Sequence, residues 1–391
     1  MRILMLSHGY PPTISGVTLI TQKFSRILHQ RGHEVLVITA SERGNAYQDE
    51  DQGVKLIRLR SYRNPYWKEG PHPFITPHQL ENLILEFRPD IIHTHANINL
   101  SYQLLKVKRS MMGTPFVSSA YSMPSFISNY SSLGERIETW LQNLIWKYLI
   151  NNLNQYDHVI FSNGTLQRMY RERGLLSPSS VISNGVNTNR YHPADGKVEA
   201  IELKYSLPPR PRLLHVSRLA RDKQIDLLIK AMPELYARSG AHLILVGRGD
   251  DRLRLESMVN DMQLNHCVHL LGYIPEEDLP VIYQACDLFV LVALCETQSL
   301  PALQALVTGL PLILAEAGCL PELVEEGVNG YLIPPNDSPA ISQAALRILN
   351  GPQRSDEIAN ASLAIGLPHS EQHSVSALIT LYDQLISGDQ P

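Results

Sequence analysis

Short runs of valine, isoleucine and leucine recur along the whole chain, and polar or amphipathic stretches long enough for helices separate them. Because these runs are apolar at nearly every position, they indicate strands buried on both faces, as in parallel sheets. The pattern predicts six strands in each half of the chain: Arg2–Ser7, Glu34–Ala40, Val54–Leu59, Asp90–Ala96, Pro115–Tyr121, His158–Asn163, Leu213–Ser217, His242–Gly247, Val268–Gly272, Leu288–Ala293, Pro311–Glu316 and Gly330–Pro334.

Strands that alternate with helices form βαβ units, and here the alternation occurs twice. We therefore predict an α/β protein with two doubly wound, Rossmann-like domains. Prolines in the stretch Pro193–Pro211 mark the break, which gives an N-terminal domain over residues 1–195 and a C-terminal domain over residues 205–370. The last segment, residues 375–391, is expected to form a helix that returns to the first domain. Ligands of open α/β sheets bind at the carboxyl ends of the strands, so we expect the functional site in a cleft between the domains.

Composition is that of a globular protein, with 44% hydrophobic and 18% charged residues. The four cysteines all lie in the second half and none forms a Cys-x-x-Cys pair, which favours reduced thiols in the cytoplasm over a disulfide framework or a zinc site. The first apolar run is only Ile3–Leu6, so we expect neither a signal peptide nor a membrane span.

Charge is unevenly distributed between the halves. Residues 1–195 hold 20 Lys and Arg against 14 Asp and Glu, whereas residues 196–391 hold 14 against 24. A basic N-terminal half suits an anionic surface, although independent drift of the two halves explains the numbers equally well. No nucleic-acid recognition motif accompanies the basic half, so we expect no nucleic-acid partner.

The stretch from Leu294 to Asn336 is the richest in candidate chemistry. A polar loop from Glu296 to Ser299 follows a predicted strand and enters a predicted helix, Leu300–Thr308. The free N–H groups of a helix start attract phosphate, and a carboxylate in the loop accepts hydrogen bonds from sugar hydroxyls. The alternative is a plain capping loop with Ser299 as the N-cap. The residues by themselves leave both interpretations open.

This stretch resembles the retaining glycosyltransferases of the GT-B fold, and glycosyltransferase family 4 in particular. That family carries two glutamates in a Glu-x7-Glu signature, then a Gly-x-Pro turn and a Pro-Glu-Leu-Val run followed by Gly-x-x-Gly. Glu296 matches the first glutamate, Gly309-Leu310-Pro311 the turn, and Pro321–Val324 with Gly327 and Gly330 the run. The resemblance covers nearly the whole chain and implies the GT-B fold.

Further positions of the second half take part in the resemblance. Arg218 and Lys223 resemble the family's phosphate clamp, in which two cations neutralise a diphosphate as the sugar departs; without the resemblance they would be a solvated helix start. Gly247 resembles the glycine of a loop that follows a strand. Gly272-Tyr273-Ile274 stands where the family contacts the nucleobase through backbone, and the backbone N–H groups near Gln298 and Ser299 are implied to assist the clamp.

In the first half, Ser15-Gly16 resembles the loop that passes under the donor phosphates, where Gly16 lets the backbone approach closely. The strand end Asp90–His95 matches the family's His-x-His and puts His95, with Tyr121, on the acceptor side. Two histidines at i and i+2 face the same way on a strand, but no third ligand is spaced to join them. Asp49-Glu50-Asp51 has a spacing that binds a divalent metal in another class of glycosyltransferases, and here we predict a solvated turn. We therefore predict no metal and no cofactor.

The chain departs from the family at three places. Gln304 stands where the second glutamate holds the ribose hydroxyls, and an amide forms a weaker hydrogen bond than a carboxylate. Tyr121 replaces a histidine at the end of the fifth strand and is a poor base near neutral pH. Around the first glutamate, Val292-Ala293 and Ser299 replace the usual Pro-Ser and Gly.

Three features indicate a lipid acceptor. The string Glu296-Thr297-Gln298 resembles the branch of the family that glycosylates lipids such as diacylglycerol. Aromatic and basic residues suited to a membrane interface interleave in one segment: Tyr62, Arg63, Tyr66, Trp67 and Lys68. A predicted helix, Glu135–Gln155, carries two apolar stripes. We expect Ile137, Leu141, Leu144, Ile145 and Tyr148 to face the core; the second stripe, Trp146, Ile150 and Leu153, either enters the headgroup region or is buried as well.

We thus predict a retaining hexosyltransferase that uses a nucleotide sugar, by resemblance UDP-linked. Glu296 would hold sugar hydroxyls, Arg218 and Lys223 the departing diphosphate, and Gln304 the ribose. The resemblance implies front-face attack, in which the donor phosphate helps to remove the acceptor's proton. We expect a lipid acceptor and a cytoplasmic enzyme placed peripherally on the membrane. Two alternatives stay open: a catalytically weakened homologue that binds a nucleotide or a partner, and a soluble glycosyltransferase acting on a polysaccharide or small sugar.

Overall fold

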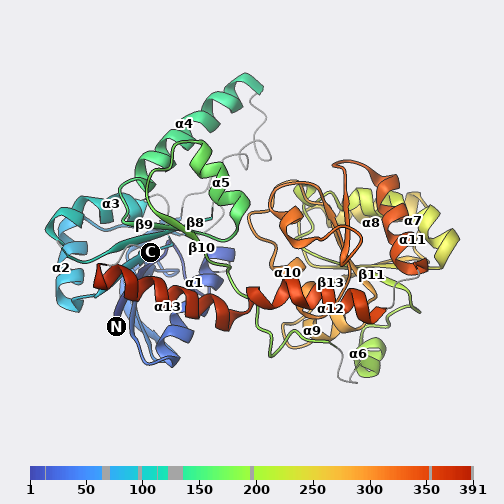
Figure 1. Ribbon diagram of the computed structural model, residues 1–391, viewed down its shortest axis with the longest axis horizontal. Helices are drawn as coiled ribbons and strands as arrows, with labels where there is room; N and C mark the ends of the chain where they lie inside the picture. Colours follow the sequence, from blue (N-terminus) through green and yellow to red (C-terminus); the bar gives the residue numbers. More distant parts are fainter. Residues whose placement is uncertain are drawn as a thin grey trace. The chain divides into compact units, whose positions relative to one another are not determined.

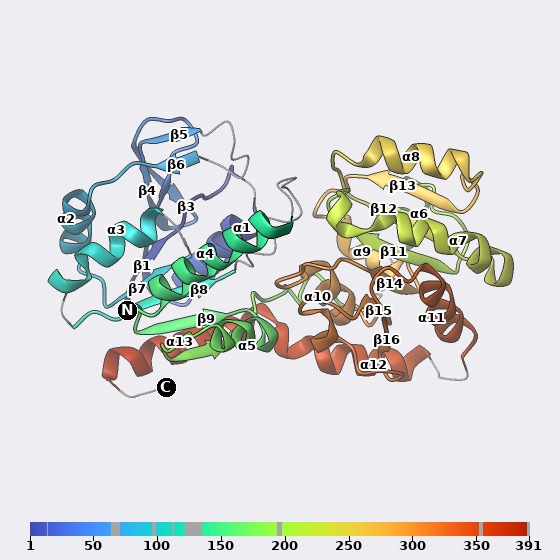
Figure 2. The same cartoon turned by 90° about the horizontal axis from the view of Figure 1, so that it is seen from above.

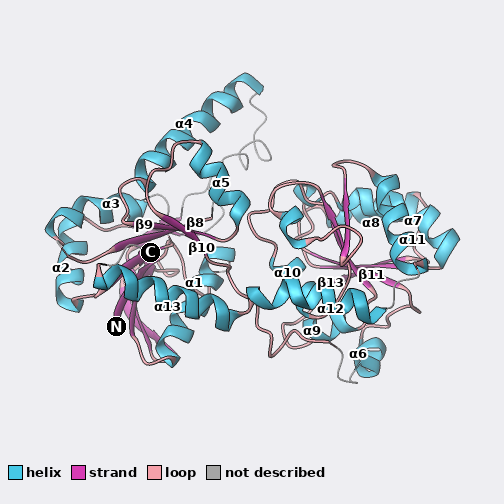
Figure 3. Cartoon of the chain, viewed as in Figure 1, coloured by secondary structure: helices cyan, strands magenta, loops and turns pink. Residues whose placement is uncertain are grey.

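The structure, a computed structural model, describes residues 1–13, 15–63, 71–95, 99–111, 113–121, 135–193, 198–351 and 355–388. The chain divides into two compact units. Unit 1 comprises Met1–Ser183 and Ser374–Pro391, and unit 2 comprises Asn184–His373. In each unit helices flank a central sheet (Figure 3). The prediction of an α/β protein with two doubly wound domains is confirmed.

The division between the units lies earlier in the chain than the predicted end of the first domain at residue 195. Backbone hydrogen bonds explain why. The Val186 N–H donates to His369 O at 2.8 Å, and the Glu371 N–H donates to Val186 O at 3.0 Å. The residues before the proline-rich stretch are therefore already part of unit 2.

Unit 1 contains an eight-stranded sheet in the order β10-β9-β8-β7-β1-β2-β4-β3, in which β3 alone is antiparallel to its neighbour. A short antiparallel ribbon of β5 and β6 follows β4 (Figure 2). The strands are β1 (Arg2–Leu6), β2 (Glu34–Ala40), β3 (Tyr47–Asp51), β4 (Val54–Leu59), β5 (Ser61–Arg63), β6 (Pro71–Pro73), β7 (Ile91–Thr94), β8 (Phe116–Ala120), β9 (His158–Phe161) and β10 (Ser179–Val181).

Two sets of helices cover the two faces of this sheet. Helices α2 (Pro77–Phe87), α3 (Asn99–Val107), α4 (Glu135–Leu153) and α5 (Gly164–Glu172) bury their apolar residues in one core cluster. Helices α1 (Gly16–Gln30) and α13 (Glu371–Ser387) bury theirs in the other. The end of the chain thus supplies part of the core of unit 1, through Val375, Leu378, Leu381 and Tyr382.

The prediction for Asp49-Glu50-Asp51 is wrong, because these residues form the edge strand β3 instead of a solvated turn. Asp49 accepts a hydrogen bond from Arg58 Nε at 3.0 Å. Asp51 accepts one from Arg26 Nε at 2.8 Å and one from the Tyr10 hydroxyl at 2.7 Å. Asp49 and Asp51 thus neutralise arginines of unit 1.

For helix α4, the expectation that the first stripe faces the core is wrong for three of its five residues, whereas one of the two alternatives for the second stripe is confirmed. The second stripe is buried, since Trp146, Ile150 and Leu153 belong to the core. In the stripe that was expected to face the core, Ile137, Leu144 and Tyr148 are exposed. Of the aromatic and basic residues named above, Tyr66, Trp67 and Lys68 lie outside the described residues, and Tyr62 is exposed.

Unit 2 contains a six-stranded sheet, parallel throughout, in the order β13-β12-β11-β14-β15-β16. Its strands are β11 (Arg212–Val216), β12 (His242–Val246), β13 (Val268–Gly272), β14 (Leu288–Leu291), β15 (Leu312–Ala315) and β16 (Gly330–Ile333). Its helices are α6 (Val198–Lys204), α7 (Ile225–Ser239), α8 (Arg252–Asp261), α9 (Leu279–Gln284), α10 (Leu300–Val307), α11 (Ser338–Asn350) and α12 (Ser355–Gly366).

The strands of unit 2 form because their side chains are apolar on both faces. Every residue of β11, β12, β14 and β15 is buried.

All four cysteines are free thiols. Of the helices that the described residues form in either unit, none has the length and hydropathy to cross a bilayer.

Candidate active site

The order of strands in unit 2 reverses between β11 and β14. From β11 the chain proceeds outward through β12 and β13, and from β14 it proceeds outward on the other side through β15 and β16. In doubly wound sheets, ligands bind outside the carboxyl ends of the strands at such a switch point. The loop after β11 carries Arg218 and Lys223, and the loop after β14 carries Glu296, so the structure brings the predicted clamp to this point.

Lys223 and Glu296 form an ion pair across the switch point. Lys223 Nζ lies 2.7 Å from Glu296 Oε1 and 3.4 Å from Asp222 Oδ2, and the Lys223 and Glu296 side chains are only 11% and 16% exposed. Burial by itself would lower the pKa of Lys223, but the nearby Glu296 and Asp222 carboxylates outweigh burial and raise it. The ammonium group therefore stays charged at neutral pH.

Arg218 belongs to the same charge cluster through Asp222. Its Nη2 lies 3.9 Å from Asp222 Oδ2, and its side chain is 61% exposed. Asp222, which is 7% exposed, was missed by the sequence reasoning although it lies between the two predicted cations. It places both cations around one carboxylate and leaves the guanidinium accessible to an anion.

Gly247 and Gly249 allow the loop after β12 to pack on the loop after β11. The φ of Gly247 is +138°, and a Cβ there would overlap the Ser217 carbonyl oxygen. A Cβ at Gly249 would overlap the Leu219 carbonyl oxygen. The Leu219 N–H donates to Arg248 O at 2.9 Å. The glycines therefore fix the course of the loop that carries Arg218.

The predicted nucleobase contacts lie at the carboxyl end of β13. Gly272 has a φ of +75°, and its carbonyl accepts a hydrogen bond from the Gly247 N–H at 2.7 Å. Ile274 is buried in the core, whereas Tyr273 is 56% exposed. The Arg248 guanidinium lies 4.9 Å from the centroid of the Tyr273 ring. Tyr273 and Arg248 are thus the side chains that this edge offers to a ligand.

The loop that carries Glu296 is held on both sides. Gly318 has a φ of +58°, and a Cβ there would lie 2.9 Å from Glu296 O. Ser299 is the N-cap of α10, and its side chain accepts a hydrogen bond from the Ala302 N–H at 3.3 Å. Gln298 Oε1 accepts one from the Asn184 N–H at 2.8 Å. The Ser299 and Gln298 side chains therefore hold the loop in place, which leaves the predicted donor contacts to their backbone.

Gln304 is half-buried on α10. Its Oε1 accepts a hydrogen bond from the Tyr283 hydroxyl at 2.9 Å, and Tyr283 is fully buried. The amide oxygen that was expected to hold ribose thus already accepts one hydrogen bond, and its second lone pair and the NH2 group are left to meet a ligand.

His215 joins the two central strands and was not among the predicted site residues. It is fully buried on β11, with Nδ1 2.9 Å from Val290 O and Nε2 2.7 Å from Ser217 Oγ. Burial lowers its pKa to about 4, so the ring is neutral. Because a carbonyl only accepts, Nδ1 carries the proton and Nε2 is the acceptor. His215 thereby positions Ser217, the residue before Arg218.

The predicted acceptor residues lie together in unit 1. His95 Nδ1 is 2.8 Å from the Tyr121 hydroxyl, and burial lowers the pKa of His95 to about 3 and raises that of Tyr121. His93 forms a hydrogen bond at each ring nitrogen, at Nδ1 with the Tyr382 hydroxyl and at Nε2 with the Ser119 hydroxyl. The described residues contain no group of three side chains suited to a metal ion. Gly16 begins α1, and a Cβ there would meet nothing within 4 Å.

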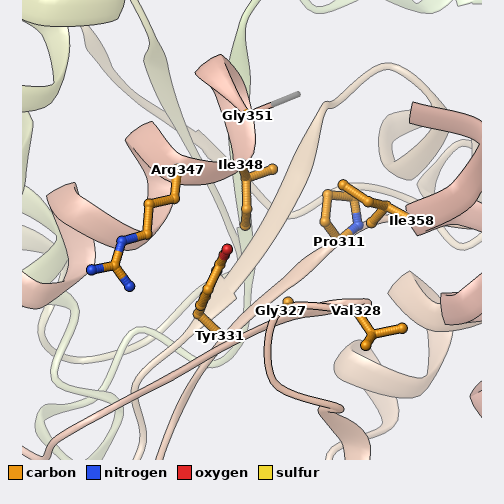
Figure 4. A pocket seen from close by; sticks show the side chains of 9 residues that line it. Pro311, Gly327, Val328, Tyr331, Arg347, Ile348, Gly351 and Ile358 are labelled. Carbon is orange, nitrogen blue, oxygen red and sulfur yellow. The ribbon is translucent and has the colours of Figure 1, made fainter. Parts of the chain in front are cut away.

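One depression of unit 2 lies away from this site. It has a volume of about 300 Å³ and borders the amino ends of β15 and β16, opposite the edge that carries Glu296. Figure 4 shows Arg347 and Ile348 of α11 on one side of it and Pro311 and Ile358 on the other. Arg347 is the one charged side chain among its described lining residues. We therefore place no chemistry there.

Comparison with known proteins identifies the class of this enzyme. The family model "Glycosyltransferase Family 4" matches residues 14–190, and the model "Glycosyl transferases group 1" matches residues 200–363. The chain is a GT-B glycosyltransferase of the family 4 type. The resemblance inferred from Glu296 and its surroundings is therefore confirmed, and the switch point of unit 2 is its candidate donor site.

Curated relatives cover most of the chain at low identity. A sulfoquinovosyl transferase of Arabidopsis thaliana is 26% identical over 83% of this chain, which spans 62% of that protein's length. An α-monoglucosyldiacylglycerol synthase of Acholeplasma laidlawii is 22% identical over 99% of this chain and 98% of its own length.

Solved structures share the fold. A sucrose-phosphate synthase of Thermosynechococcus elongatus has a TM-score of 0.79 and 21% identity, and the alignment covers 100% of both chains. The Anabaena protein HepE, solved in complex with UDP, has a TM-score of 0.77 and 20% identity, covering 98% of this chain and 100% of its own.

Proposed function

We propose that this glycosyltransferase moves a hexose from a UDP-linked donor to a membrane lipid, with retention at the anomeric carbon. The observation that carries the proposal is the Lys223–Glu296 ion pair at the switch point, 2.7 Å long and largely buried. An anionic diphosphate and a sugar with free hydroxyl groups are the two halves of a nucleotide sugar, and a cation beside a carboxylate suits both.

The residues divide the work according to their charge. Arg218 and Lys223 stabilise the negative charge that grows on the departing diphosphate. Glu296 accepts hydrogen bonds from the sugar hydroxyls and holds Lys223 in place. The bond between the anomeric carbon and the diphosphate oxygen breaks while the bond to the acceptor oxygen forms on the same face. The acceptor's proton passes to the departing phosphate oxygen, and the two side-chain cations take the place of a metal.

The choice of UDP and of a lipid rests on the relatives. The neighbouring HepE structure holds UDP, and two of the relatives are a monoglucosyldiacylglycerol synthase and a sulfoquinovosyl transferase. A lipid acceptor requires that the enzyme work at a membrane surface, so we propose peripheral association with a bilayer.

The test is a transfer assay with radiolabelled UDP-hexoses and GDP-mannose, diacylglycerol in mixed micelles and a water-soluble sugar as a competing acceptor. We expect one UDP-hexose to label the lipid, NMR of the product to show the donor's anomeric configuration, and EDTA to leave the rate unchanged. Glu296→Ala should abolish transfer, while the exposed Glu277→Ala should not.

Each other outcome removes one part of the proposal. An inverted product contradicts retention, and loss of activity in EDTA contradicts the metal-free clamp. Label in the sugar alone favours the soluble alternative. No transfer from any donor, together with measurable UDP binding, favours the binding-module alternative.

A further inference from the structure

Helix α4 presents an apolar stripe to solvent along its N-terminal part. Four large side chains share it, spaced three, four and four residues apart, and they are 51%, 63%, 52% and 41% exposed: Ile137, Trp140, Leu144 and Tyr148. We call these four residues the α4 stripe. At about 1.5 Å per residue it forms a line roughly 16 Å long. Isolated exposed apolar residues are common, but a contiguous line on one helix marks an interaction site.

The stripe is exposed because it lies on the face of α4 opposite the residues that pack into the core, at about 100° of rotation per residue. The C-terminal half of the helix buries Trp146, Leu149, Ile150 and Leu153 in the core of unit 1. The N-terminal half extends beyond α3 and α5 (Figure 1). Helix α4 is therefore anchored through one face, and its opposite face displays apolar surface that this unit's core does not use.

Basic residues are exposed in the same layer of helices as the stripe. Seven exposed lysines and arginines lie on the helices α3, α4 and α5 or in the loops that follow them: Lys106, Arg109, Arg136, Lys147, Arg168, Arg171 and Arg173. The Lys106 ammonium lies 4.2 Å from the centroid of the exposed Tyr102 ring. Nearby acidic groups are fewer, and Asp157 is neutralised by Lys108 at 2.7 Å. The described part of this layer is thus positively charged.

We propose that the α4 stripe, together with the basic residues of this helical layer, docks on a bilayer of anionic phospholipid. Tryptophan and tyrosine prefer the headgroup level of a membrane, and an apolar helix face with flanking cations binds in the plane of that interface. Anionic lipid attracts the lysines and arginines, which gives the surface a specific partner. The inference deepens the proposed function, because a lipid acceptor lies in the membrane that this surface would meet.

Vesicle flotation tests the proposal without any need for turnover. The full chain is mixed with vesicles of phosphatidylcholine alone or with added phosphatidylglycerol. We expect binding to the mixed vesicles and at least tenfold weaker binding to phosphatidylcholine or at high salt, since salt screens surface charge. Trp140→Glu combined with Leu144→Glu should reduce binding to the mixed vesicles at least tenfold. The matched control, Leu253→Glu, alters a leucine of α8 that is 78% exposed and should bind like the wild type.

The outcomes separate this inference from the proposed function. Equal binding by the double variant and the wild type, with unchanged thermal unfolding, overturns docking through α4. So does a wild type that binds no vesicles, even if it glycosylates lipid in micelles; the proposed transfer to lipid then stands, and the proposed association with a bilayer is contradicted. If the wild type is a dimer and the double variant a monomer, the stripe is a subunit interface instead. Vesicle binding by an enzyme that transfers no sugar to lipid supports docking and contradicts the acceptor.

Discussion

Lys223 lies 2.7 Å from Glu296 and 3.4 Å from Asp222, so a bound diphosphate would meet it as one member of a charged cluster. Two carboxylates around one ammonium leave the cluster net negative, and Arg218 beside Asp222 restores the balance. A diphosphate bound beside Arg218 would therefore compete with Asp222 for that guanidinium. The accessible Arg218 is suited to capture the donor, and the buried Lys223 to hold the groups around the bond that breaks.

Replacing Lys223 tests this cluster. We expect Lys223→Met to lower kcat/KM for the donor at least about 100-fold, because one preorganised positive group next to a developing anion is typically worth that much. Lys223→Arg should recover part of the loss. The control is Lys230→Met on α7, which removes an equally charged but surface ion pair with Asp226. A rate for Lys223→Met within a few-fold of the wild type would contradict the clamp.

Gln304 decides between an active and a weakened donor site. The buried Tyr283 hydroxyl donates to its amide oxygen at 2.9 Å, and a carboxylate would accept the same bond. We therefore expect Gln304→Glu to fold normally. It should bind UDP about fivefold more tightly, as a charge-assisted hydrogen bond to ribose adds roughly 1 kcal/mol.

Isothermal titration with UDP measures the affinity of the Gln304→Glu variant. Tyr283→Phe, which frees the amide oxygen, is the companion variant. Unchanged affinity in Gln304→Glu would mean that position 304 does not reach the ribose. A gain of transfer by this variant over an inert wild type would identify a decayed site.

At this scale the resemblance in the sequence predicted Glu296, Arg218 and Lys223 as site residues, and the structure places them in one charge cluster, while their roles stay predictions. The sequence did not identify His215 or Asp222, whose importance depends on what a buried side chain touches across two strands. Nor did it show that Gln298 holds the Asn184 N–H, because that contact joins residues far apart in the chain.

The elements were predictable where apolar runs are continuous. Each of the twelve expected strands is present, and β2, β4 and β13 have the expected bounds. Strand β3 was missed because its polar sequence, Tyr47–Asp51, forms an edge strand whose carboxylates pair with arginines. The first stripe of α4 was assigned to the wrong face, since both stripes fit a helical period and only the packing of the helix on the core selects between them.

The glycine loop after β12 supports a prediction at the level of the element. Gly247 and Gly240 both have positive φ, but a Cβ would overlap Ser217 O at the first and meet nothing within 4 Å at the second. We expect Gly247→Ala to destabilise the protein by more than about 2 kcal/mol and Gly240→Ala by only about 1 kcal/mol. Urea unfolding followed by circular dichroism measures both. Equal effects would show that the loops after β11 and β12 adjust to each other.

For the whole molecule, buried histidines couple stability to pH. Burial lowers the pKa of His95 in unit 1 to about 3 and that of His215 in unit 2 to about 4, whereas an unfolded chain has histidines near 6.5. As the pH falls below about 6.5, protons bind the unfolded chain first. The contribution of these histidines to the free energy of unfolding is therefore fully present above that pH. It declines as the pH falls, until the pKa of the histidine in the folded protein is reached.

As the pH falls from about 6 to about 4, we expect each of these histidines to lower the free energy of unfolding by up to about 1.4 kcal/mol per pH unit. All three tryptophans, Trp67, Trp140 and Trp146, belong to unit 1, so their fluorescence during urea unfolding reports that unit. His95→Asn removes one titrating ring. The free energy of unfolding of unit 1, measured through the tryptophan signal, should then depend less on pH. His78→Asn is the control, since an exposed ring is hydrated in both states. A stability of unit 1 that is constant from pH 7 to pH 5 would mean that the buried rings of unit 1 accept protons without unfolding.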